Sequence, residues 1–206
     1  MISTQVNVIL CLGDSLTAGT PGYDPSFGGN PKYQYGYWMA ERAKSIGFGE
    51  IRFDNHGIPG DLASSMRSRL RRALENCDYD AVVLLAGSND LGWGNSPATV
   101  YQSLLLLWEE VLASDKPLIR CTIPPIGSVY PPIQKAQLEL NKMIIEYYPE
   151  SGITACVNLF AGLSTTEGLL ESRYDSGDGL HLSVDGYREV GVLVWDQGLD
   201  RIFAKK

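Results

Sequence analysis

A serine just beyond a short apolar segment is the first residue that could do chemistry. The segment runs from Val6 to Leu12, contains several β-branched residues, and is followed by Gly13, Asp14 and Ser15. Such a run predicts a buried strand, and the glycine permits a sharp turn that presents the serine hydroxyl at the strand's carboxyl end. The same residues also suit a strand end followed by the cap of a helix, because Asp and Ser are common caps.

A second cluster near the other end of the chain could complete this chemistry. Asp178 lies three residues before His181, which is one of only two histidines. A nucleophilic serine needs a base, and the base needs a carboxylate to fix its tautomer. At this spacing the carboxylate can reach one ring nitrogen and leave the other for Ser15. We therefore predict a triad of these three residues, with Asp175 as the alternative carboxylate and His56 as the alternative base.

Ester hydrolysis also needs donors for the negatively charged oxygen of its tetrahedral intermediate. Gly57 could offer its backbone N–H at close range, Asn89 its side-chain amide, and Ser15 its own N–H. Each of the first two also has a purely structural explanation. Gly57 and Gly60 could form a tight turn, and Asn89 could cap its loop through an Asx-turn.

Strand and helix patterns alternate along the chain in a way that brings these candidates together. Between the predicted strands lie segments with the 3.6-residue apolar period of helices, which implies a parallel sheet covered on both faces. We predict an α/β fold, a three-layer α/β/α sandwich with a five-stranded parallel sheet. Ligands of such sheets bind at the carboxyl ends of the strands, where every candidate residue falls. The predicted strands are residues 6–12, 51–55, 81–86, 118–122 and 154–159.

The four clusters together resemble the blocks of the GDSL, or SGNH, hydrolase superfamily. Asp61 follows Gly60 where many members place another residue before a threonine, which leaves the blocks intact. The resemblance implies a flavodoxin-like fold, the Ser15, Asp178 and His181 triad, an oxyanion hole from Ser15, Gly57 and Asn89, and no metal or cofactor. The matching stretches are Gly13-Asp14-Ser15-Leu16, Asn55-x-Gly57-x-x-Gly60, Gly87-x-Asn89-Asp90 and Asp178-x-x-His181.

The length, charge and composition of the chain exclude several other classes of protein. At 206 residues and 44% hydrophobic, the chain fits one domain over residues 1–206. Its formal charge of -7 argues against nucleic acid, and four arginines on one predicted helix are interpreted as a solvated face. No stretch suits stable insertion in a membrane. Four cysteines without metal spacing and the lack of a visible signal peptide predict a cytoplasmic protein, although a chain trimmed of its leader would look the same. The arginines are Arg67, Arg69, Arg71 and Arg72.

The blocks leave the substrate open, since members of the superfamily accept short acyl esters, lysophospholipids, thioesters, acetylated sugars and aryl esters. The aromatic-rich segment from Pro21 to Trp38 is expected to flank the site, with Trp38 itself packed in the core. Trp93 and Tyr130 are expected to line a modest apolar pocket. A long-chain lipase usually needs an apolar lid or groove at the lipid interface, and the sequence shows no such segment. We therefore predict a serine esterase for small or medium acyl esters.

Two kinds of alternative function stay open. The same triad would serve an acyltransferase, a thioesterase or a lysophospholipase. A non-enzymatic flavodoxin-like binding module is the distant alternative, since the loop after the first strand has few glycines for a phosphate and carries Asp14 where an anion would bind.

Overall fold

A five-stranded parallel sheet forms the centre of the computed structural model, which describes residues 6–127, 131–149 and 152–203. Its order is β4-β1-β5-β6-β7, so the first strand lies inside the sheet. Central strands of parallel sheets are buried on both faces and are therefore mostly apolar, as AVVLL and, after its first residue, NVILCLG show. The predicted sheet is confirmed. The strands are β1 (Asn7–Gly13), β4 (Ile51–Gly57), β5 (Ala81–Leu85), β6 (Leu118–Cys121) and β7 (Thr154–Val157).

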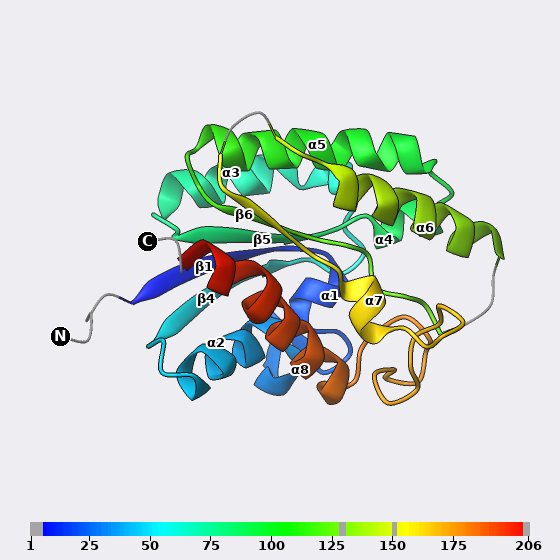
Figure 1. Ribbon diagram of the computed structural model, residues 1–206, viewed down its shortest axis with the longest axis horizontal. Coiled ribbons are helices and arrows are strands. Elements are labelled where there is room, and N and C mark those ends of the chain that lie inside the picture. Colours follow the sequence, from blue (N-terminus) through cyan, green and yellow to red (C-terminus); the bar gives the residue numbers. More distant parts are fainter. Residues whose placement is uncertain (1–5, 128–130, 150–151, 204–206) are drawn as a thin grey trace.

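Helices cover both faces of this sheet (Figure 1). One face carries α3 (Arg67–Asn76), α5 (Pro97–Ala113) and α6 (Pro131–Glu146), and the other carries α2 (Tyr35–Ser45) and α8 (Val184–Leu193). After α8 the chain continues through a π-helical stretch (Val194–Leu199) into α9 (Asp200–Phe203). Alternate residues of β1 enter the two cores, with Ile9 on the α2 and α8 side and Leu10 on the other. The predicted three-layer sandwich is thus confirmed.

Shorter elements occupy the carboxyl edge of the sheet and its surroundings. There α1 (Ser15–Ala18), α4 (Ser88–Gly92) and α7 (Leu159–Leu163) follow strands directly. The segment from Pro21 to Trp38 forms a small hairpin of β2 (Tyr23–Asp24) and β3 (Gly28–Gly29), a 3₁₀ turn (Pro31–Tyr33) and the start of α2. A second 3₁₀ turn (Ala63–Ser65) precedes α3.

The strand register places the functional loops next to one another. Gly13 at the end of β1 lies opposite both Gly57 of β4 and Leu85 of β5. Because three adjacent parallel strands end at one level, the loops that follow them meet at one place. These are the loops that carry three of the four predicted blocks.

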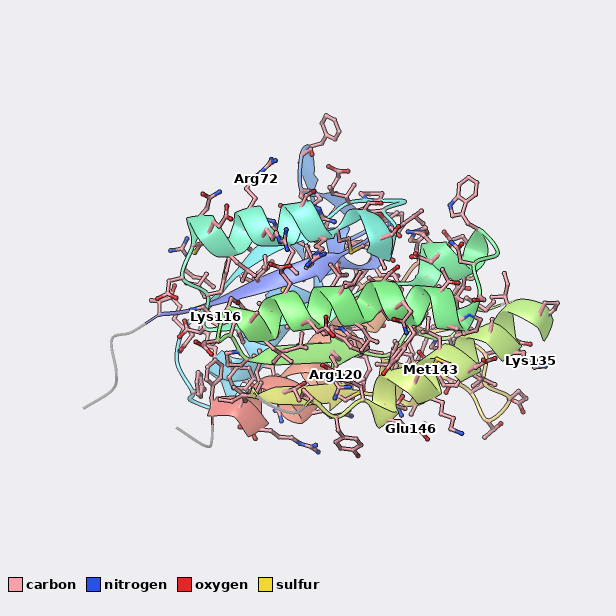
Figure 2. The ribbon with its side chains drawn as sticks, turned by 90° about the horizontal axis from the view of Figure 1, so that it is seen from above. Arg72, Lys116, Arg120, Lys135, Met143 and Glu146 are labelled. Carbon is pink, nitrogen blue, oxygen red and sulfur yellow. The ribbon has the colours of Figure 1, made fainter. Side chains whose placement is uncertain are left out.

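Three buried polar side chains fix α6 against the end of β6. Arg120, labelled in Figure 2, donates to the carbonyl of Ile144 in the last turn of α6 at 2.6 Å, where the helix dipole favours a cation. Gln137 donates to the Pro124 carbonyl, and Asn141 exchanges two hydrogen bonds with the backbone of Ile123. The helix and the loop after β6 therefore form one unit beside the carboxyl edge.

Within residues 6–127, 131–149 and 152–203, none of the helices combines the length and the apolar character that a membrane span requires.

Candidate active site

The turn between β1 and α1 presents Ser15 at the carboxyl edge. A Cβ on Gly13 would lie 2.2 Å from both the Leu85 carbonyl oxygen and Thr17 Oγ1, so the turn needs glycine at this position. Asp14 caps α1 by accepting a hydrogen bond from the backbone N–H of Leu16 at 3.0 Å. The helix-cap explanation therefore holds for Asp14, while Ser15 becomes the first residue of the helix.

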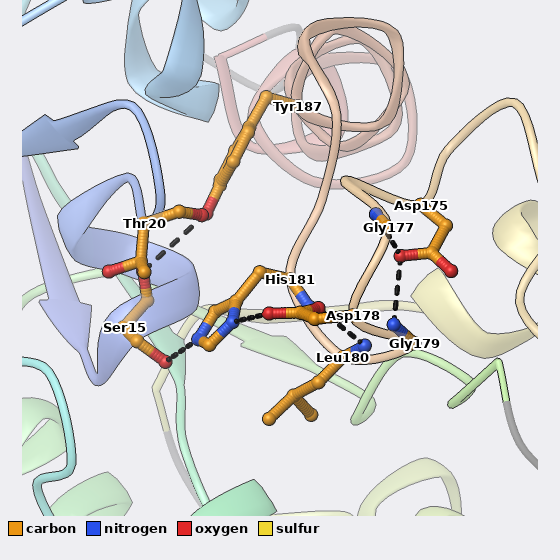
Figure 3. A network of polar contacts seen from close by, with 9 residues as sticks. All are labelled: Ser15, Thr20, Asp175, Gly177, Asp178, Gly179, Leu180, His181 and Tyr187. Atoms are coloured by element: carbon orange, nitrogen blue, oxygen red, sulfur yellow. Dashed lines mark hydrogen bonds and ion pairs between the residues drawn. The ribbon is translucent and has the colours of Figure 1, made fainter.

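Ser15, His181 and Asp178 form a continuous line of hydrogen bonds (Figure 3). The distance from His181 Nε2 to Ser15 Oγ is 3.0 Å, and that from His181 Nδ1 to Asp178 Oδ2 is 2.6 Å. A carboxylate can only accept here, so Nδ1 carries the hydrogen and Nε2 is free to accept from the serine hydroxyl. This is the arrangement that activates a serine as a nucleophile.

The second oxygen of Asp178 shapes the loop that carries the base. Asp178 Oδ1 accepts from the backbone N–H groups of Leu180 at 2.9 Å and His181 at 2.7 Å. Partial burial acts to raise the pKa of Asp178, but hydrogen bonds from the His181 ring and from these two N–H groups lower it to about 2. The group is therefore an ionised acceptor over the pH range in which enzymes work.

Asp175, the alternative carboxylate, has a different partner set. Its Oδ1 accepts from the N–H groups of Gly177 at 2.8 Å and Gly179 at 3.0 Å, as Figure 3 shows. It therefore builds the turn rather than holding the imidazole. The alternative base, His56, is half-buried in β4, and burial lowers its pKa; among the described residues, none of its hydrogen bonds joins it to Ser15.

Two of the predicted oxyanion donors are placed so that one N–H hydrogen has no acceptor among the described residues. Ser15 opens α1, so its N–H has no partner within the helix. Asn89, in the first turn of α4, donates one Nδ2 hydrogen to the Asp61 carbonyl at 3.0 Å. An amide nitrogen has two hydrogens, so one remains for a ligand.

The third predicted donor, Gly57, is not placed in this way. Its N–H already donates to Asn55 Oδ1 at 2.9 Å, and a Cβ at this position would lie 2.0 Å from the Ala18 nitrogen. Asn55 in turn donates to the Ala18 carbonyl at 3.0 Å and to Gln34 Oε1 at 2.9 Å. Gly57 thus serves the close packing of β4 against α1, and its prediction as an oxyanion donor is corrected.

Gly60 is the glycine of this loop whose N–H stays available. It has a positive φ of 80° and lies in a turn in which the Asp61 N–H bonds the Ile58 carbonyl at 3.1 Å. The Ile58 N–H bonds the Gly13 carbonyl, and the Asp61 carbonyl bonds Asn89. In the part of the chain that the structure describes, the Gly60 N–H meets no acceptor.

A mainly apolar pocket of 280 Å³ opens next to Asp178 and Asn89. Asn89 and Asp178 form its polar border, and Trp93, predicted to line a pocket, is 80% exposed at its rim. Tyr130 lies outside the described residues. The residues that line the pocket are Ser88, Asn89, Leu91, Gly92, Trp93, Ile123, Ile126, Ile133, Gln137, Asp178, Gly179 and Leu180.

No residue of the aromatic segment from Pro21 to Trp38 lines that pocket. Tyr23 and Pro25 instead border a separate hollow along β4. Trp38 is partly buried against the core, as predicted, and its Nε1 donates to the Lys32 carbonyl at 2.8 Å.

Two residues behind Ser15 are in surroundings that the sequence did not predict. Asp14 is buried, and in the described part of the chain its Oδ2 has no hydrogen-bond partner. Burial, reinforced by the Asp90 carboxylate and opposed by the Leu16 N–H, raises the pKa of Asp14 to about 7. Arg69 is also largely buried rather than solvated, and it contacts Asp61. The solvated-face interpretation is corrected for this arginine; Arg67 and Arg71 pair with Glu110.

A family model described as GDSL-like lipase/acylhydrolase matches residues 11–189. The chain belongs to this family. The match includes every residue of the predicted triad and of the predicted oxyanion hole. No protein with a curated description matches the chain at a significant level.

Solved structures of GDSL-family proteins are similar in fold. A member of the lipolytic G-D-S-L family from Veillonella parvula has a TM-score of 0.74 at 20% identity, covering 98% of this chain and 100% of that one. The lipase/acylhydrolase from Enterococcus faecalis has a TM-score of 0.72 at 21% identity, covering 97% of each chain. Est24, a carbohydrate acetylesterase from Sinorhizobium meliloti, has a TM-score of 0.68 at 17% identity, covering 97% and 100%. At these identities the likeness shows the fold.

Proposed function

We propose that this GDSL-family hydrolase is a serine esterase that cleaves small or medium acyl esters through an acyl-enzyme. The observation that carries the proposal is the unbroken line from Asp178 through His181 to Ser15, with 2.6 Å and 3.0 Å between the bonded atoms. The three residues come from two distant parts of the chain and converge at the edge where parallel sheets bind ligands. A structural role alone does not require this order of acceptor, imidazole and hydroxyl.

In the proposed reaction, Ser15 Oγ attacks the ester carbonyl carbon while His181 Nε2 takes the hydroxyl proton. Asp178 stabilises the imidazolium. When the intermediate collapses, the bond to the leaving oxygen breaks and His181 gives its proton to the departing alcohol. Water then attacks the acyl group with His181 again as base, which releases the acid and restores the serine hydroxyl.

The proposed oxyanion hole consists of the Ser15 N–H, the second amide hydrogen of Asn89 and the N–H of Gly60. Gly60 takes the place first assigned to Gly57, because the Gly57 N–H is bound to Asn55. Support for Gly60 comes from its turn, which is bonded to Gly13 at one end and to Asn89 at the other. Donors fixed before the reaction stabilise the intermediate without reorganisation.

The apolar pocket supports an acyl chain of more than two carbons as the preferred substrate group. Each methylene that enters such a surface contributes about 0.8 kcal/mol, which corresponds to roughly fourfold in kcat/KM. The 280 Å³ volume limits this gain to a short or medium chain. Release of acetyl groups from sugars, the activity named for Est24, is the contrasting possibility.

Exposure of the triad favours water over another alcohol as the acyl acceptor. The Asp178 side chain is 50% exposed and that of His181 18%, so solvent borders the base, while Ser15 is buried behind it. An acyltransferase needs water to be excluded from its acyl-enzyme. Hydrolysis is therefore preferred to acyl transfer by the same triad.

A series of p-nitrophenyl esters from acetate to dodecanoate tests the proposal. We expect kcat/KM to rise about fourfold per methylene until the pocket is full and then to level or fall. Acetylated sugars, an acyl thioester and a lysophospholipid are measured alongside, and products are identified with and without added alcohol. If none of the esters is hydrolysed, the proposal is contradicted. If acetylated sugars are preferred, the substrate class is acetylated carbohydrates rather than longer acyl esters.

A further inference from the structure

Arg69 joins three acceptors that surround the turn carrying the nucleophile. Its Nη1 donates to the His56 carbonyl, and its Nη2 lies 3.3 Å from the Gly13 carbonyl oxygen and 2.5 Å from Asp61 Oδ2. Gly13 and His56 belong to the last two residue pairs of the ladder between β1 and β4. A single guanidinium thus links two strand ends to the loop that follows β4.

The partly buried position of the Arg69 side chain suits the planar guanidinium group of arginine. Arg69 lies in α3 with a side chain that is 19% exposed, and the Asp61 side chain is 15% exposed. An ion pair held away from water needs further hydrogen bonds to offset its desolvation, and the two carbonyls supply them. Arginine can serve three acceptors in fixed directions, whereas the ammonium of lysine is a compact point charge.

Asp61 connects this fork to Asn89. Its carboxylate receives Arg69, and its carbonyl oxygen receives one Nδ2 hydrogen of Asn89 at 3.0 Å. Because the amide group is planar, fixing one of the two hydrogens also fixes the direction of the other. Gly60 immediately precedes Asp61, so the same loop carries a second proposed donor.

We propose that Arg69 is a positioning residue of the oxyanion hole, acting through Asp61 on the amide of Asn89. This inference rests on the proposed esterase function. Arg69 does not itself touch the reacting atoms, since its hydrogen bonds end on Asp61 and on two backbone carbonyls. Its effect therefore arises in the transition state, when the substrate oxygen becomes charged and requires the Asn89 hydrogen.

The test is a double-mutant cycle between Arg69 and Asn89 in the full chain. Arg69→Met should lower kcat by roughly 10- to 100-fold with little change in KM, a loss bounded by that of one whole oxyanion donor. In an Asn89→Ala background, the same substitution should lower kcat by only about threefold or less, because the donor that Arg69 orients is already absent. A residue that merely ties strand ends together would give additive effects.

Two further variants keep the result interpretable. Arg69→Lys retains the charge and loses the fork, so kcat should still fall by at least about fivefold, and the cycle is repeated with it in case the methionine variant does not fold. Arg72→Met is the matched control, because Arg72 is exposed on the same helix and points away from the body of the protein in Figure 2. Thermal unfolding is measured for each variant.

Additive losses in kcat, or wild-type kcat in a folded Arg69→Lys protein, would overturn this inference alone. Activity that survives Ser15→Ala would overturn the proposed function, and this inference with it.

Discussion

Asp178→Asn separates the role of the carboxylate from the shape of its loop. Asparagine keeps an oxygen where Oδ1 accepts the N–H groups of Leu180 and His181, so the loop should persist. The other position changes from an acceptor to an NH₂ donor, 2.6 Å from His181 Nδ1. The imidazole must then accept at Nδ1 and carry its hydrogen on Nε2, where it can no longer take the proton of Ser15.

The expected loss follows from this change of tautomer. In a serine protease triad the corresponding substitution leaves the geometry intact and lowers kcat by about 10⁴-fold, which corresponds to ~5.5 kcal/mol in activation free energy. We expect a similar loss here, with KM changed less than threefold or so, because the tautomer affects proton transfer and not ground-state binding.

The assay is steady-state hydrolysis of a p-nitrophenyl ester, with circular dichroism and thermal unfolding to verify the fold. Asp175→Asn is the matched control, since its Oδ1 bonds only backbone N–H groups of the same loop and it should keep near-wild-type kcat. A folded Asp178→Asn enzyme with kcat within about tenfold of wild type would refute the tautomer argument. A larger loss in Asp175→Asn would assign the carboxylate role to Asp175.

Two more substitutions test other parts of the site. Asn89→Ala should lower kcat by roughly 10²- to 10³-fold, ~2.7 to 4 kcal/mol, with KM little changed; a loss of stability with normal kcat would instead make Asn89 a loop cap. Asp14 should make stability depend on pH. The pKa of Asp14 in the folded state, about 7, lies above its value in the unfolded chain, near ~4. Between these two pH values the folded state binds more protons than the unfolded state. The free energy of unfolding should therefore fall as the pH rises from about 4 to 7, by at most ~4 kcal/mol. In Asp14→Asn this dependence should vanish, so the melting temperature of the variant minus that of wild type should increase from pH 5 to pH 8. An unchanged difference would show that the buried carboxyl does not titrate in this range.

The strands and the pairing of Asp178 with His181 could be predicted from the sequence because each depends on a local pattern or a short spacing. Apolar runs such as residues 81–85 specify strands buried on both faces, and parallel strands place their following loops at one edge. The three-residue spacing of Asp178 and His181 fits a single turn, and the structure has a bend here that is closed by the Asp178 carboxylate, which accepts from the N–H groups of Leu180 and His181. The segment from Pro21 to Trp38 was harder, since its aromatic residues suit either a pocket or a hairpin, and only tertiary packing decides between them.

The backbone donors and the buried arginine could not be predicted in the same way. Gly57 and Gly60 both fit a close approach of the backbone, but which N–H remains available depends on Asn55, whose side chain turns back onto Gly57. Arg69 shares its helix with three other arginines, and the helical period alone does not show which one faces the strand ends. Both questions depend on side-chain directions set by contacts between distant segments.

The nucleophilic role of Ser15 is tested most directly by covalent labelling with a fluorophosphonate, read by mass spectrometry of the intact protein and of its peptides. Wild type and Ser26→Ala, a change at an exposed turn residue, should each gain one adduct on Ser15. Ser15→Ala should gain none and should lose most activity, on the order of 10⁶-fold in kcat. An adduct on another residue, or hydrolysis that persists in a folded Ser15→Ala protein, would contradict the assignment of Ser15 as the nucleophile.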